Sequence, residues 1–113
     1  MIVIKRIYEP KDSADGCRVL VDRLWPRGVS KQKAGLDLWL KDIGPSTELR
    51  QWFAHDPKKW LQFQKRYREE LKSKTDQIAT LRGLEKEHRT VTLLYGARDE
   101  VHNEAVVIAE ILK

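Results

Sequence analysis

Residues 90–99 read Thr-Val-Thr-Leu-Leu-Tyr-Gly-Ala-Arg-Asp and divide into two parts of opposite character. The first part, Thr90–Tyr95, is β-branched and apolar, which is typical of a strand that is covered on both faces of a sheet. The second part opens with Gly96 and is polar, which indicates a loop. A helical apolar pattern follows on Val101, Ala105, Ile108 and Leu112. This strand–loop–helix order is half of a parallel βαβ unit and favours an α/β fold.

Other apolar segments extend the predicted sheet toward the N-terminus. Met1–Arg6 and Val19–Asp22 are predicted strands. Apolar and polar residues alternate only briefly in Leu36–Leu40, which is therefore predicted to be either a strand or a short irregular segment. Between them, Glu9–Gly16 and Leu24–Gln32 carry the Pro, Gly, Asp and Ser residues of loops. The sequence therefore predicts a single α/β domain over residues 1–113, with a small, mainly parallel sheet flanked by helices.

Start signals and apolar spacing predict four helices. Ser46–Phe53 begins with a serine N-cap, and Asp56-Pro57 places a cap and a first-turn proline at the start of the next helix. Thr75–Lys86 is predicted as the third, and Asp99 as the cap of the last. The second of these helices has an apolar face formed by Trp60, Phe63, Tyr67 and Leu71.

Length and composition exclude several classes of protein. A chain of 113 residues with 41% apolar content is long enough for the core of one domain and too apolar for disorder. Its longest apolar run, Ala105–Ala109, is too short to span a membrane, and the N-terminus lacks the apolar region of a signal peptide. The only cysteine, Cys17, has no partner for an internal disulfide. We therefore expect a cytoplasmic protein with no membrane partner.

Polar side chains follow two of the predicted strands where each one ends. Parallel strands bring their carboxyl ends to one edge of the sheet, so these polar side chains are expected to lie close together. In open α/β sheets, ligands bind at this edge. Guanidinium groups hold phosphates and carboxylates, Gly96 permits close approach of the backbone, and a helix beginning at Asp99 would present free N–H groups. We therefore predict a cleft for an anionic small molecule such as a nucleotide or phosphoester, with a purely structural cluster of ion pairs as the alternative. The predicted ligand-binding residues are Arg23, Arg27, Ser30, Lys31, Tyr95, Gly96, Arg98 and Asp99.

Asp22 and His102 are the candidate catalytic residues. The positive end of a helix disfavours an imidazolium cation, so a histidine in the first turn after Asp99 stays neutral and accepts a proton as a general base. Asp22 would orient this histidine or act as the acid–base group itself; the alternative is a histidine that packs on the surface. The reaction stays open, with hydrolysis or group transfer on a phosphorylated substrate as the hypothesis, and no cofactor is assigned. The three histidines show no metal-ligand spacing, so no metal site is predicted.

The net charge of +5 suggests a function of a different class. Residues 57–73 contain six lysines and arginines against two glutamates, and Lys58, Lys65 and Lys72 lie seven residues apart. A helix with this face is suited to a phosphate backbone, so a nucleic-acid-binding module is the second hypothesis. The third is a non-catalytic protein-interaction domain, a dimer included, with tryptophans at its interface. A solvated basic face and tryptophans in the core are the structural alternatives.

Several sequence blocks built around rare residues occur in a fixed order along the chain. They are Val19–Gly28, Leu36–Asp42, Pro45–Arg50, Trp52–Pro57 and Leu93–Asp99, followed by His102-Asn103. In these blocks, which cover nearly the whole chain, the sequence resembles the YeaO-like family of uncharacterised bacterial proteins, a domain-of-unknown-function family. The resemblance implies an α/β domain in the bacterial cytoplasm and no established reaction. In the wider group the last motif tends to read Cys-His-Arg, whereas this chain has Val101-His102-Asn103, so the resemblance does not imply thiol chemistry here.

Overall fold

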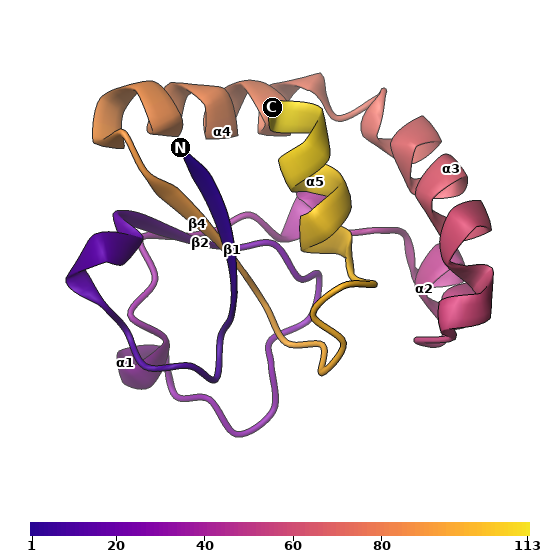
Figure 1. The fold of residues 1–113 in the computed structure, drawn as a ribbon, viewed down its shortest axis with the longest axis horizontal. Coiled ribbons are helices and arrows are strands. Elements are labelled where there is room, and N and C mark those ends of the chain that lie inside the picture. The colour runs from indigo at the N-terminus through magenta and orange to yellow at the C-terminus, as the bar shows by residue number, and fades with distance from the viewer.

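A four-stranded parallel sheet lies at the centre of the computed structural model, which describes all of residues 1–113 (Figure 1). Its strands are β1 (Ile2–Arg6), β2 (Cys17–Leu20), β3 (Leu38–Trp39) and β4 (Val91–Tyr95), in the order β1-β4-β2-β3. All three pairings are parallel, and β4 is buried along its whole length. The predicted α/β fold with a parallel sheet is confirmed.

Helices cover the two faces of this sheet unequally (Figure 1). The larger layer contains α2 (Thr47–Phe53), α3 (Trp60–Leu71), α4 (Thr75–His88) and α5 (Glu104–Leu112), whereas only the four-residue α1 (Lys31–Ala34) lies on the opposite face. None of these helices has the length and apolar character needed to cross a membrane.

Alternation along β4 creates two separate apolar clusters. Val91, Leu93 and Tyr95 point into the main core, which also contains the predicted apolar face of α3. Leu94 points the other way, into a small cluster with Ile7, Leu20 and Ala34. The thicker core therefore lies beneath α3, α4 and α5, and the opposite face has room for buried polar groups.

Arg18 of β2 is the largest of these buried polar groups, with 1% of its surface exposed. Its guanidinium group bonds the Asp15 carboxylate and donates to the carbonyls of Ala34, at 2.8 Å, and Gly35, at 3.2 Å. Lys5 binds the same carboxylate at 3.0 Å. Arg18 thus closes the C-terminal end of α1 and ties that helix to the sheet, because carbonyls at a helix end lack partners within the helix.

The start of α1 corrects one predicted boundary. The segment Leu24–Gln32 is not loop throughout, because Ser30 caps a short helix that begins at Lys31. The Ser30 hydroxyl accepts a hydrogen bond from the backbone N–H of Lys33 at 3.1 Å. Ser30 and Lys31 therefore belong to a local structural element.

The start of α5 corrects a second boundary, since this helix begins at Glu104 and not after Asp99. The N-cap is Asn103, which has extended backbone and accepts a hydrogen bond from the N–H of Val106 at 3.3 Å. Asp99 instead accepts from the N–H groups of Val101 and His102, both at 2.9 Å, and closes a separate turn. His102 consequently lies just before the N-cap, so its predicted place in the first turn of the helix is wrong.

Ala54 ends α2 in a left-handed conformation, with φ 45° and ψ 39°. Glycine adopts this conformation without steric cost, so Ala54→Gly is expected to raise the free energy of unfolding by about 0.5–1 kcal/mol. Urea unfolding measures the change. The matched control is Ala79→Gly in the exposed interior of α4, where the same substitution is expected to cost about 1 kcal/mol. A loss of stability at both positions would contradict the strain assigned to Ala54.

Candidate ligand-binding site

The two polar strand ends singled out in the sequence meet directly in the structure. β2 and β4 are adjacent and parallel, and the backbone N–H of Gly96 donates to Oδ2 of Asp22 at 2.9 Å. A Cβ atom at position 96 would lie only 3.0 Å from that oxygen. Gly96 therefore permits close approach as predicted, but the group that approaches is the Asp22 carboxylate.

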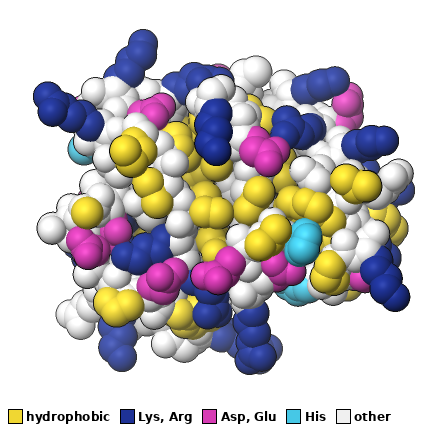
Figure 2. Space-filling model, viewed as in Figure 1, with side chains coloured by type: hydrophobic (Ala, Val, Ile, Leu, Met, Phe, Trp, Pro, Cys, Tyr) yellow, Lys and Arg dark blue, Asp and Glu magenta, His cyan; other side chains and the backbone are white.

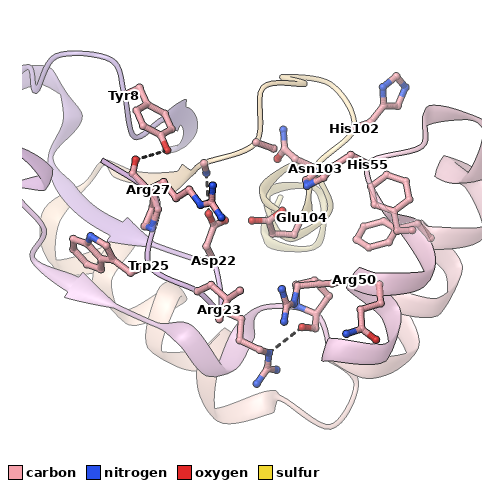
Figure 3. Close-up of a pocket in the computed structure, with 18 residues that line it drawn as sticks. Tyr8, Asp22, Arg23, Trp25, Arg27, Arg50, His55, His102, Asn103 and Glu104 are labelled. Carbon is pink, nitrogen blue, oxygen red and sulfur yellow. Dashed lines mark hydrogen bonds between the residues drawn. The ribbon is translucent and has the colours of Figure 1, made fainter. Parts of the chain in front are cut away.

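A cavity of about 420 Å³ lies beside this contact, at the carboxyl ends of the strands (Figure 3). Three segments line most of it, namely residues 22–27 after β2, residues 50–55 at the end of α2, and residues 102–104 at the start of α5. Phe53 and Phe63 supply a flat apolar wall, with their rings stacked at a centroid distance of 4.3 Å. The cavity thus combines an aromatic wall with charged groups, as in sites for small organic ions.

Two carboxyl groups, those of Asp22 and Glu104, face each other in this cavity (Figure 3). Burial raises the pKa of Glu104 well above its ordinary value, and a hydrogen bond to Asp22 and the Asp22 charge raise it further, while Arg50 opposes the shift. Oδ1 of Asp22 is buried, and no backbone N–H, amide or hydroxyl group donates a hydrogen bond to it. A protonated Glu104 can donate to this oxygen, and the raised pKa of Glu104 favours that form.

The arginines of the cavity differ in how many of their N–H groups are free to bind a ligand. Arg23 donates from Nε to the carbonyl of Pro45, at 2.9 Å, and from Nη2 to that of Gly44, at 2.8 Å, and so fixes a neighbouring loop. Arg50 has a buried Nε without a partner, and its remaining bond is a 3.4 Å contact to the Thr47 hydroxyl. Arg50 therefore has more N–H groups without a hydrogen-bond acceptor than Arg23 has.

His102 lines the cavity, but Asp99 and not Asp22 orients it. Its Nδ1 lies 2.8 Å from the Asp99 carboxylate, and its ring meets Trp60 edge-on at a centroid distance of 5.2 Å. Hydrogen bonds from the His102 backbone, the His102 ring and the Val101 backbone lower the pKa of Asp99 to about 2. Figure 3 shows the ring pointing away from the carboxyl pair. The structure thus separates the two candidate catalytic residues, Asp22 and His102.

The remaining predicted residues lie in several places. Arg23 and Arg27 line the cavity together with Asp22, Gly96 and His102. Arg98 is exposed and does not line it, and Tyr95 is buried in the main core with 2% of its surface exposed. Tyr95 points into the core because it follows Val91 and Leu93 in the alternation of β4.

Further residues line the cavity that the sequence did not identify as site residues. They are Tyr8, Arg50, Gln51, Phe53, His55, Phe63, Asn103 and Glu104. Arg50 and His55 come from the end of α2, which tertiary packing brings over the strand ends. The only local signal at Glu104 is an acidic residue near a helix start, which is common in structural helices.

Two basic side chains of the segment 57–73 form ion pairs with carboxylates. Lys72 pairs with Glu69 at 3.0 Å, and the neighbouring Arg68 pairs with Glu110 at 2.7 Å. On the face shown in Figure 2, the Lys and Arg side chains are spread over the molecule and do not gather in one patch. A nucleic-acid interface through Lys58, Lys65 and Lys72 stays a prediction, as does a protein interface formed by the tryptophans.

Fold and cavity together define a small α/β protein with a charged cleft at the carboxyl ends of a parallel sheet. A family described as "Inactive DUF488-N3 subclade" matches residues 1–113, and the chain belongs to that family. It is 41% identical over 112 residues to the "Uncharacterized protein YeaO" of Escherichia coli, covering 99% of this chain and 96% of that protein. The "Uncharacterized protein Rv3073c" of Mycobacterium tuberculosis is 40% identical over 109 residues, which are 96% of this chain and 91% of that protein. These matches confirm the YeaO-like resemblance, and no solved structure matches.

Proposed function

We propose that this protein binds a small anionic molecule with a flat apolar part, such as an aromatic phosphoester, in the cavity beside Asp22. Its anionic group lies against Arg50, and its apolar part lies on the wall formed by Phe53 and Phe63. A buried free cysteine, Cys17, is consistent with the reducing cytoplasm as the site of action.

The unpartnered Nε of Arg50 is the observation that carries this proposal. A buried guanidinium N–H without an acceptor costs free energy, and an anion that accepts from it removes that cost. Arg23, whose Nε and Nη2 are already bonded to carbonyls, is a weaker candidate for the same role. Arg27 is exposed and lines the cavity, where it adds positive charge near the entering ligand.

Binding without turnover is supported by the description of the family as inactive. The chain also has Val101 and Asn103 on either side of His102, where the wider group that the sequence resembles tends to have Cys and Arg. His102 itself is held by Asp99 and turned away from Asp22 (Figure 3). These features favour a binding protein over a hydrolase or transferase.

Arg50→Gln tests the proposal by NMR titration with phenyl phosphate. A charge-assisted hydrogen bond contributes about 1.5–3 kcal/mol, so the variant is expected to bind about ten- to a hundredfold more weakly than the wild type. The matched control is Arg98→Gln, which removes the same charge outside the cavity. This control is expected to bind within about twofold of the wild type, and both variants should keep the wild-type unfolding transition.

Each other outcome contradicts the proposal in a specific way. Equal affinity in wild type and Arg50→Gln would remove Arg50 from the site, and a loss confined to Arg98→Gln would place the anion where the sequence predicted it. If a short RNA binds instead, with a steep dependence on salt and sensitivity to Lys65→Glu, the basic segment is the functional surface.

A further inference from the structure

We propose that Glu104 competes with an anionic ligand for Arg50. The cavity then accepts an anion while the Asp22–Glu104 pair holds a proton, and it rejects the anion once both carboxyl groups are ionised. This inference rests on the proposed function and adds its regulation by pH. The proton leaves to solvent, and no covalent bond forms or breaks.

The first step of the argument is the geometry of the carboxyl pair. Oδ2 of Asp22 accepts the N–H of Gly96, so the Asp22 carboxylate is fixed to the end of β4. Its other oxygen, Oδ1, is buried and lacks a donor, while the Glu104 carboxyl group faces it (Figure 3). Two close carboxylates repel each other when both are charged, so a proton shared between them is favoured until a cation compensates the second charge.

The second step concerns the cation available when this proton leaves. Arg50 and Glu104 both line the cavity, and the positive charge of Arg50 favours ionised Glu104 against the effect of burial. Two groups of Arg23 are bonded to the carbonyls of Gly44 and Pro45, so Arg50 is the better placed of the two to compensate a second carboxylate. An anionic ligand needs the same guanidinium group. Ionisation of Glu104 therefore weakens ligand binding, and by thermodynamic linkage ligand binding disfavours ionisation of Glu104 to the same extent.

Other titratable groups lie near the carboxyl pair, and the experiment has to separate their effect from that of Glu104. The buried Tyr67 of α3 donates to the carbonyl of Ile43 at 2.6 Å, and burial raises its pKa well above the ordinary value, so it stays neutral. His55 and His102 line the cavity, and a histidine in its cationic form attracts anions. The other charged or titratable groups near the pair are Tyr8, Arg23, Arg27, Arg50, His55, Tyr67 and His102.

Benzenesulfonate is the probe for this inference, because its charge is constant between pH 5 and pH 10 and its ring suits the aromatic wall. For the wild type, the dissociation constant measured by NMR titration is expected to rise at least tenfold across this range. Glu104→Gln keeps an N–H donor for Oδ1 of Asp22 and cannot ionise. Its dissociation constant is expected to change less than threefold across the range and to be below that of the wild type at pH 10.

His55→Gln and His102→Gln separate the carboxyl pair from the histidines, and both are expected to keep the rise of the dissociation constant with pH. The inference is overturned if Glu104→Gln shows the wild-type rise, or if the rise disappears in a histidine variant. In either case benzenesulfonate still binds, and the proposed function stands. Absence of binding at every pH, in the wild type and in Glu104→Gln, overturns both.

Discussion

Replacing Arg18 by methionine is expected to lower the free energy of unfolding by about 3–5 kcal/mol, the usual result of removing one partner of a buried ion pair. The guanidinium group is nearly inaccessible and bonds Asp15 as well as the carbonyls of Ala34 and Gly35. Methionine fills a similar volume without any donor. The carboxylate then keeps Lys5 as a partner, and the two carbonyls at the end of α1 lose theirs.

Urea unfolding at neutral pH measures this loss, and Arg68→Met is its matched control. Arg68 forms an ion pair of similar length with Glu110, but its side chain is 44% exposed, and such surface pairs contribute between 0 and about 1 kcal/mol. A loss of less than about 1 kcal/mol in both variants would mean that the Arg18 network adds nothing beyond a surface contact.

Glu104→Gln is expected to change how stability depends on pH. Burial, followed by the hydrogen bond and charge of Asp22, raises the folded-state pKa of Glu104 well above the ordinary value of 4.5. A raised pKa contributes stability that is fully present below pH 4.5 and is lost as the pH rises through the folded-state value. The wild type is therefore expected to lose stability relative to the variant as the pH rises above 4.5 through the neutral and alkaline range.

Urea unfolding of both proteins across this range measures the difference, and each pKa unit of displacement corresponds to about 1.4 kcal/mol. Glu110→Gln, on an exposed position of the same helix, is the control and should parallel the wild type. Parallel curves for the wild type and Glu104→Gln would show that Glu104 titrates in the folded protein as it does in water.

The local sequence determined the secondary structure that supports the site. Apolar β-branched residues predicted β4, and the cap at Ser46 and the apolar face of α3 were also correct. Asp22 and Gly96 were predictable as neighbours because polar residues at the ends of adjacent parallel strands share an edge. The start of α5 was wrong because Asp99 and Asn103 both have capping side chains, and only the backbone conformation shows which one begins the helix.

Tertiary structure decided which side chains face the cavity. Arg50 and Glu104 are 54 positions apart, and no local pattern relates them. Packing of α2 against α3, and of α5 against α3, β1 and β4, brings both residues to the cavity. Packing also removed residues that the sequence favoured, since Tyr95 faces the core and Arg98 lies outside the cavity. The sequence by itself therefore determined the fold and the edge of the sheet at which the cavity forms. The charges within the cavity depend on side-chain directions and burial, which arise only when distant segments pack together.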